Sequence, residues 1–300
     1  MEKIVILFVL ATVCGANAIS YDPTGRISGG SAAIVNQFPY AISLQQVSLL
    51  NQYTRGHQCG GVLVTYQHAV TAATCLYRIA NGVQSLIVPG EYRVFAGSIS
   101  LTNDSNADLF RTPANFTVHP SYTGYPALAN NIAIITLLTP FPAHAVTPLS
   151  LPSAPIEPAD FTVCSVVGWG AQNTSATASV SLRYASKYIY SQDLCTFQYS
   201  SVSNAPNILP SMICATSYDI ISAGCDGDLG NALVCPGGLT GILSVHNSCA
   251  SVALPEVYTR VSNYTTWIRS VTGGASTFQP AVATLFIFAV VQLITAKIIS

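Results

Sequence analysis

Gly227-Asp228-Leu229-Gly230-Asn231 lies among short apolar runs that are separated by Gly, Pro, Asn and Ser residues along most of a 300-residue chain. Examples of these runs are Ala41–Leu44, Gly61–Val64, Tyr92–Ala96, Ile132–Leu138, Thr162–Val167, Leu239–Val245 and Val257–Val261. Runs this short and this frequent predict β-strands and an all-β barrel or sandwich.

Two segments depart from this pattern. The segment from Pro140 to Pro158 contains six prolines, which excludes a helix or a central strand and predicts a connector between two halves. Residues Ser262 to Val271 are predicted to form a helix that Ser262 caps. The apolar residues of its predicted buried face are Val261, Tyr264, Trp267, Ile268 and Val271.

Residues 1–18 have the pattern of a secretory signal peptide. Lys3 supplies the positive charge, Ile4–Val13 is apolar, and Ala16-Asn17-Ala18 is a small-residue cleavage site. The apolar run is too short to span a bilayer. We therefore predict export, followed by a short pro-segment at residues 19–26.

Cysteine usage agrees with export. The chain has nine cysteines, and Cys14 is removed with the signal peptide, so eight remain. An even number in an oxidising compartment predicts four disulfides, although eight cysteines allow 105 pairings. No Cys-x-x-Cys spacing or His/Cys cluster indicates zinc, and we expect neither a metal nor a cofactor.

Four Asn-x-Ser/Thr triplets are candidate surface glycosylation sites in an exported protein. They begin at Asn103, Asn115, Asn173 and Asn263.

The last segment, residues 272–300, combines a flexible linker with an apolar tail. Small residues surround Gly273, and residues 281–296 are apolar apart from threonines and Gln292. This pattern favours a glycolipid-anchor signal. A short membrane-spanning helix with Lys297 at its end, or a secreted protein with an ordinary apolar tail, are the alternatives.

Charge excludes one class of partner. Charged residues make up 8% of the chain and its formal net charge is -1. Such a chain has no basic field that would attract nucleic acid.

Several motifs identify a family resemblance. Arg26-Ile27-Ser28-Gly29-Gly30, Val166-Val167-Gly168-Trp169-Gly170 and Val257-Tyr258-Thr259-Arg260-Val261 occur together with the stretch quoted first. Over residues 27–271 the chain resembles the chymotrypsin–trypsin family of serine proteases. The resemblance implies two packed six-stranded antiparallel β-barrels with a C-terminal helix. It also implies cleavage after Arg26, which frees an ammonium group on Ile27 to pair with Asp228.

The resemblance also implies the disulfide pairing, because the cysteines fall at the family's positions. The implied pairs are Cys59–Cys75, Cys164–Cys235, Cys195–Cys214 and Cys225–Cys249.

The chain departs from the family at the three catalytic positions. Thr74, Asn131 and Leu229 stand where the family has the general base His, the orienting Asp and the nucleophile Ser. Thr74 has no basic nitrogen and Leu229 has no oxygen with which to attack. The five histidines offer no replacement matched to a nucleophile by motif, so the sequence predicts loss of the reaction.

Two other parts of the implied site, the oxyanion hole and the specificity pocket, differ in how far they keep what the family requires. The oxyanion hole uses the main-chain N–H groups of Gly227 and Leu229, which do not depend on the Leu229 side chain, although Asn231 replaces a family glycine. The specificity pocket has Ala223 at its floor, and His246 and Glu256 replace small wall residues. We hypothesise that His246 and Glu256 pair and plug the pocket; the alternative is that one or both face solvent.

The sequence therefore predicts a secreted or surface-anchored serine protease homolog that lacks peptidase activity and acts by binding a protein. The expected partner is a substrate protein, an inhibitor, an active protease or a surface receptor. An active endopeptidase of the same family is the main alternative, and a surface glycoprotein with no specific ligand is a third.

Overall fold

The computed structural model describes residues 30–273 except 53, 81–82, 103–104, 153–156, 172–176, 218–222, 247–248 and 250–252. The predicted signal peptide, Arg26, Ile27 and the apolar tail lie outside the described residues, as do Asn103 and Asn173. Asn115 and Asn263 are both exposed.

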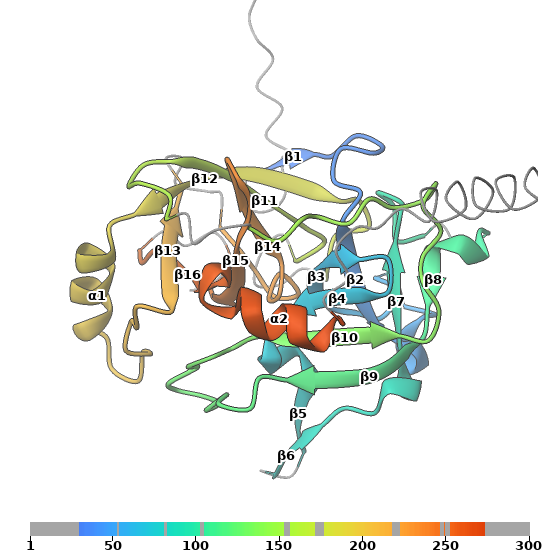
Figure 1. Cartoon of the computed structure of the whole chain (residues 1–300), viewed down its shortest axis with the longest axis horizontal. Coiled ribbons are helices and arrows are strands. Elements are labelled where there is room, and N and C mark those ends of the chain that lie inside the picture. Colours follow the sequence, from blue (N-terminus) through green and yellow to red (C-terminus); the bar gives the residue numbers. More distant parts are fainter. Residues whose placement is uncertain are drawn as a thin grey trace, which may run out of the picture.

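The N-terminal half forms an antiparallel sheet of seven strands, in the order β8-β7-β2-β3-β4-β10-β9 (Figure 1). Its strands are β2 (Ala41–Gln46), β3 (His57–Thr65), β4 (His68–Thr71), β7 (Tyr92–Ala96), β8 (Phe110–Arg111), β9 (Pro113–Val118) and β10 (Ala133–Leu137).

The C-terminal half forms a second antiparallel sheet in the order β1-β12-β11-β14-β15-β16-β13. Its strands are β1 (Ser31–Ala32), β11 (Val163–Gly168), β12 (Arg183–Tyr190), β13 (Met212–Thr216), β14 (Ala232–Cys235), β15 (Gly238–Val245) and β16 (Glu256–Arg260). An additional pairing of β12 with β13 closes six of these strands into a barrel. The two predicted antiparallel barrels are therefore confirmed, with one or two short strands added at the edges.

Alternation along the strands explains how the barrels form. In β12 the side chains of Ala185, Lys187 and Ile189 are buried, while the residues between them are more exposed. A period of two places these three on the core side of the sheet. Lys187 thus carries its ammonium group into an apolar interior and requires a partner there.

The helices are few and short. They are α1 (Gln192–Ser200), α2 (Thr265–Val271) and the 3-10 turns η1 (Val47–Leu49), η2 (Ala73–Leu76), η3 (Pro89–Glu91), η4 (Ala107–Leu109) and η5 (Val261–Tyr264). The predicted helix over residues 262–271 thus begins as a 3-10 turn, and Ser262 does not cap α2. Its buried face is as predicted, with Val261, Tyr264 and Ile268 in the core. None of the helices in the described ranges is long and apolar enough to cross a membrane.

The connections follow the sequence. Between β10 and β11 the described residues contain no helix or strand, as the six prolines predict. All four disulfides pair as the resemblance implied. One feature was not predicted: β5 (Tyr77–Ala80) and β6 (Val83–Leu86) form a separate two-stranded hairpin that projects from the N-terminal half (Figure 1).

Candidate functional site

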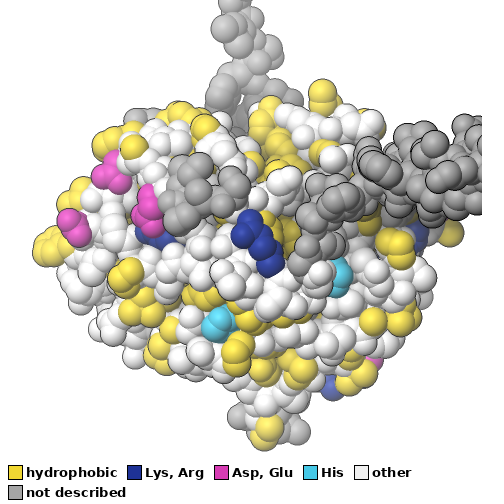
Figure 2. Space-filling view, viewed as in Figure 1, with side chains coloured by type: hydrophobic (Ala, Val, Ile, Leu, Met, Phe, Trp, Pro, Cys, Tyr) yellow, Lys and Arg dark blue, Asp and Glu magenta, His cyan; other side chains and the backbone are white. Residues whose placement is uncertain are grey.

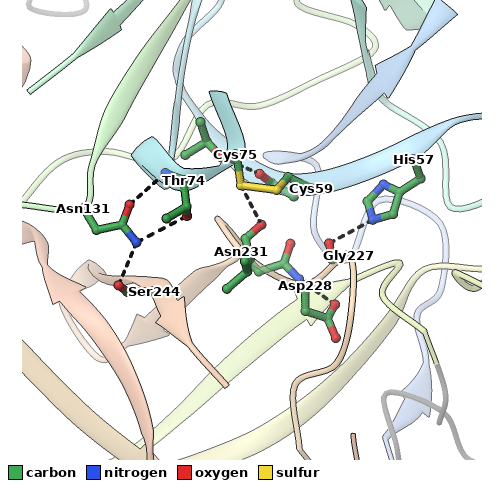
Figure 3. Close-up of a disulfide and its surroundings, with 12 residues drawn as sticks. His57, Cys59, Thr74, Cys75, Asn131, Gly227, Asp228, Asn231 and Ser244 are labelled. Carbon is green, nitrogen blue, oxygen red and sulfur yellow. Dashed lines mark hydrogen bonds between the residues drawn. A yellow bond between two sulfur atoms is a disulfide. The ribbon is translucent and has the colours of Figure 1, made fainter. Parts of the chain in front are cut away.

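The fold brings Thr74 and Asn131 together between the two barrels (Figure 3). Thr74 lies in η2, and Asn131 lies two residues before β10. The main-chain N–H of Thr74 donates to Asn131 Oδ1 at 2.9 Å, and Asn131 Nδ2 donates to Thr74 Oγ1 at 3.3 Å. Neither side chain accepts or releases a proton near neutral pH.

Asn131 also links this pair to the C-terminal barrel. Its side chain is fully buried, and Nδ2 donates to Ser244 Oγ at 2.8 Å. Its main-chain oxygen accepts from Thr259 Oγ1 at 2.8 Å. The position that the resemblance assigns to a charged Asp is therefore occupied by a neutral Asn, whose side chain hydrogen-bonds β15 and whose main-chain oxygen hydrogen-bonds β16.

Leu229 lies in a tight turn that has a glycine at each end. Gly227 and Gly230 have φ angles of 91° and 85°, a region that favours residues without a Cβ. A Cβ on Gly230 would lie 2.2 Å from Thr71 Oγ1, so glycine is required there. The Leu229 side chain packs against the cores of both barrels, and its main-chain oxygen accepts from Gly60 N at 2.9 Å.

Asp228 is buried directly beside this turn. Its Oδ1 accepts from Gly170 N at 3.0 Å and from Asn231 Nδ2 at 2.8 Å, and Oδ2 accepts from Cys225 N at 3.0 Å. Burial raises the pKa of Asp228 to about 7, against the lowering effect of the two main-chain donors. The charge of Glu256 raises this pKa further and the charge of Lys187 lowers it.

Asn231 fits its position because glycines leave room for it. A Cβ on Gly60 would lie 1.6 Å from Asn231 Oδ1, and one on Gly168 would lie 1.9 Å from Asn231 Nδ2. The replacement of a family glycine by Asn231 therefore leaves the turn intact, because the added side chain fills space beside two other glycines.

The predicted pairing of His246 with Glu256 is wrong. Glu256 is buried, and its Oε1 accepts from Lys187 Nζ at 2.9 Å and from the N–H of Gly224, while Oε2 accepts from Tyr258. His246 Nε2 instead lies 3.9 Å from Asp226 Oδ1, and its Nδ1 has no hydrogen-bond partner among the described atoms.

Glu256 pairs with Lys187 and not with His246 because of the charges that the two partners carry. Burial lowers the pKa of His246, so its imidazole is neutral at pH 7, although Asp226 and Glu256 oppose the shift. A buried carboxylate is stabilised by an ammonium and by N–H and O–H donors, all of which Glu256 has. Lys187 rather than His246 is therefore the charged partner of Glu256. A void of about 10 Å³ lies beside Glu256, room for a single water molecule at most.

Sequence reasoning missed Lys187. The signal was present, because this lysine occupies the core-facing position of a strand between Ala185 and Ile189. Its partner lies 69 residues further along the chain, so only barrel closure brings the two together.

A buried histidine near this site, His57, is hydrogen-bonded to the hydroxyl of Ser43. Its Nε2 lies 3.0 Å from the carbonyl oxygen of Gly227, which makes Nε2 the protonated nitrogen. Its Nδ1 therefore accepts from Ser43 Oγ at 2.7 Å. Ser43 is fully buried and His57 is 7% exposed, so a substrate does not reach this pair. His57 thus makes two hydrogen bonds, one to each half of the molecule.

We expect acid to destabilise the fold through His57. Burial lowers its pKa from 6.5 to about 4, so the unfolded chain binds the extra proton in this window. The associated stability is present above pH 6.5 and is lost as the pH falls toward 4, on the order of 3 kcal/mol. Urea unfolding of wild type and His57→Gln across this range measures it, and the difference between the two cancels opposing terms such as Asp228. Equal pH profiles for both proteins would contradict the expectation.

Comparisons with known proteins agree with this geometry. The family model described as Trypsin matches residues 27–268. The chain is 32% identical to granzyme M of Homo sapiens over 278 residues, covering 88% of this chain and 96% of granzyme M. It is 34% identical to anionic trypsin of Canis lupus familiaris over 268 residues, with the same coverage. The solved structure of neuropsin, a serine protease expressed in the limbic system of mouse brain, superimposes with a TM-score of 0.66 at 29% identity, covering 81% of this chain and 98% of neuropsin.

Proposed function

Because this chain belongs to the trypsin family of serine proteases, we propose that it is a member that binds other proteins without cleaving them. The observation that carries this proposal is the identity of the three side chains at the catalytic positions. Thr74 and Asn131 are neutral and hydrogen-bonded to each other, and Leu229 is an apolar side chain packed against the cores.

The chemistry of acyl transfer supports the proposal. The family's reaction requires a nucleophilic oxygen, a base to take its proton and an anion to hold the base. Loss of the nucleophile or the base lowers turnover by about 10⁴ to 10⁶. The Ser43–His57 pair does not replace them, because it lies buried beneath the surface.

The filled pocket supports it independently. A protease of this family uses a pocket to hold one substrate side chain beside the nucleophile. Here Glu256, one of the predicted pocket residues, is buried and bonded to Lys187 and Tyr258, and in this proposal these side chains fill the pocket. A partner would bind over this face without inserting a large side chain.

Four disulfides are consistent with an extracellular protein. Anchoring through the apolar tail is part of the proposal, with a glycolipid anchor favoured over a membrane-spanning helix. Mass spectrometry of the mature carboxyl terminus distinguishes the two. Charged residues make up 8% of the chain, and the face that α2 covers carries few of them (Figure 2). So low a charge favours recognition by shape and hydrogen bonding over recognition by charge.

A fluorophosphonate probe tests the absence of catalysis. The purified protein, cut after Arg26, is expected to remain unlabelled while trypsin in the same tube is labelled, because only an activated serine reacts. Covalent labelling that maps to a serine of this chain would establish the alternative, an active endopeptidase.

Binding is tested with defined partners. The protein is passed over immobilised trypsin and over an immobilised protein inhibitor of trypsin. Each column is washed with high salt and detergent to remove non-specific binding. Retention on one of these identifies an active protease or an inhibitor as the partner class. Retention on neither leaves a receptor or substrate protein to be sought on native cells, where absence of saturable binding would favour a passive surface glycoprotein.

A further inference from the structure

We infer that the segment 224–231, which carries the former nucleophile position, is held in its folded arrangement by two buried carboxylates and their in-chain partners before any cleavage after Arg26. The resemblance implies instead that a freed amino terminus organises this segment through Asp228. The inference concerns the state of the proposed binding face, and it rests on the proposed function only for the use of that face.

Asp228 fixes the segment from one side. Its two oxygens accept three hydrogen bonds, from Gly170 N, Cys225 N and Asn231 Nδ2. A carboxylate offers about four acceptor positions. Most of its hydrogen-bonding capacity is therefore met by groups of the chain itself, and one of the donors is a side chain at a position where the family has glycine.

The space around this carboxylate is shaped for these contacts. A Cβ on Gly170 would lie 2.2 Å from Asp228 Cγ, and Gly60 and Gly168 leave the room that Asn231 fills. Asp228 is 2% exposed and Asn231 is 4% exposed. The two side chains are therefore enclosed in one orientation, side by side as Figure 3 shows.

Glu256 fixes the segment from the other side. Its Oε1 accepts from the main-chain N–H of Gly224, at the start of the segment, and from Lys187 Nζ. Tyr258 donates to Oε2. Glu256 and Lys187 are 4% and 1% exposed, so this ion pair is enclosed by the barrel. Lys187 and Glu256 are thus positioning residues for a segment that neither belongs to.

Lys187 offsets the charge of Glu256, and the three donors to Asp228 are neutral N–H groups. Burial raises the pKa of Asp228 to about 7. His57, on the other side of Gly227, is neutral because burial lowers its pKa to about 4. Tyr258 is neutral as well, because burial raises its pKa well above 10.

The test compares hydrogen exchange in two forms of the full chain. Arg26→Gln keeps the bond after residue 26 intact, and wild type is cut there by limited proteolysis and verified by N-terminal sequencing. Amide exchange across 224–231 and at Gly170 is expected to agree within about twofold between the two forms. Exchange about tenfold faster in the intact form would overturn the inference.

Asn231→Gly in both forms makes the test specific. Without the Asn231 amide, the intact form is expected to exchange about tenfold faster across the segment, and cutting is expected to restore protection. Asn36→Gly, the same change at an exposed residue, is the matched control and is expected to leave exchange in the segment unchanged. An intact Asn231→Gly protein as protected as wild type would remove Asn231 from the inference and overturn it.

The comparison of intact Arg26→Gln with cut wild type tests the inference even when Asn231→Gly does not fold. The readout is amide exchange, so it does not require a known partner or catalysis. Failure of the proposed function, seen as fluorophosphonate labelling, is therefore separate from failure of this inference.

Discussion

The triple variant Thr74→His, Asn131→Asp and Leu229→Ser is expected to react covalently with a fluorophosphonate and to hydrolyse small esters. Thr74 and Asn131 are already hydrogen-bonded neighbours, so His and Asp at these positions are placed to form the base and its orienting anion. Rates of ester hydrolysis are expected to rise by about 10³-fold or more over wild type, part of what these groups supply in the family.

The matched control is Thr74→His with Asn131→Asp alone. It has the base and the anion but no nucleophile, so it is expected to remain unlabelled. A folded, cut triple variant that neither labels nor hydrolyses esters would mean that the turn at residue 229 does not present its side chain to the base.

The same triple variant tests whether the pocket is filled. Peptides with large side chains before the scissile bond are expected to remain uncut, because we propose that the buried Glu256 and its partner Lys187 take the space that such a side chain would enter. Efficient cleavage of these peptides would show that the pocket opens in solution.

Lys187→Met is expected to cost about 3–5 kcal/mol of unfolding free energy, the range for breaking a buried ion pair from one side. Methionine replaces the chain as far as its fourth atom and removes the ammonium, which leaves Glu256 buried with Gly224 N and Tyr258 as donors. For a domain of this size the loss corresponds to roughly a 10 °C lower midpoint in thermal unfolding.

Two further variants separate charge from packing. Lys187→Met with Glu256→Gln removes both charges and is expected to recover a large part of the loss. Arg78→Met breaks the exposed Arg78–Glu91 pair, whose atoms lie 3.6 Å apart, and is expected to cost less than about 1 kcal/mol. A Lys187→Met protein no less stable than Arg78→Met would contradict the role given to the buried pair.

The sequence by itself determined the strand-rich fold and, through its motifs, the resemblance to the family. Short apolar runs report strand length directly, and the motifs fix the spacing of the landmarks along the chain. These features are local, so they can be read without knowing which distant side chains meet. The two barrels and the four disulfide pairs join residues far apart in the chain and were predicted only through the resemblance.

The start of α2 was harder to predict from the sequence, because the 3-10 turn η5 buries the same face as a helix would. The apolar periodicity therefore extended the predicted helix over a turn with different hydrogen bonds.

Only the tertiary structure decided what fills the pocket and what holds Asp228. Lys187 reaches Glu256 because β12 and β16 both border β13 in the closed barrel, although 69 residues separate the two along the chain. Asn231 fits because Gly60 and Gly168, from two other strands, leave space beside it. A buried charge pairs with the nearest strong partner that the fold supplies, and which partner is nearest is a property of strand order and register.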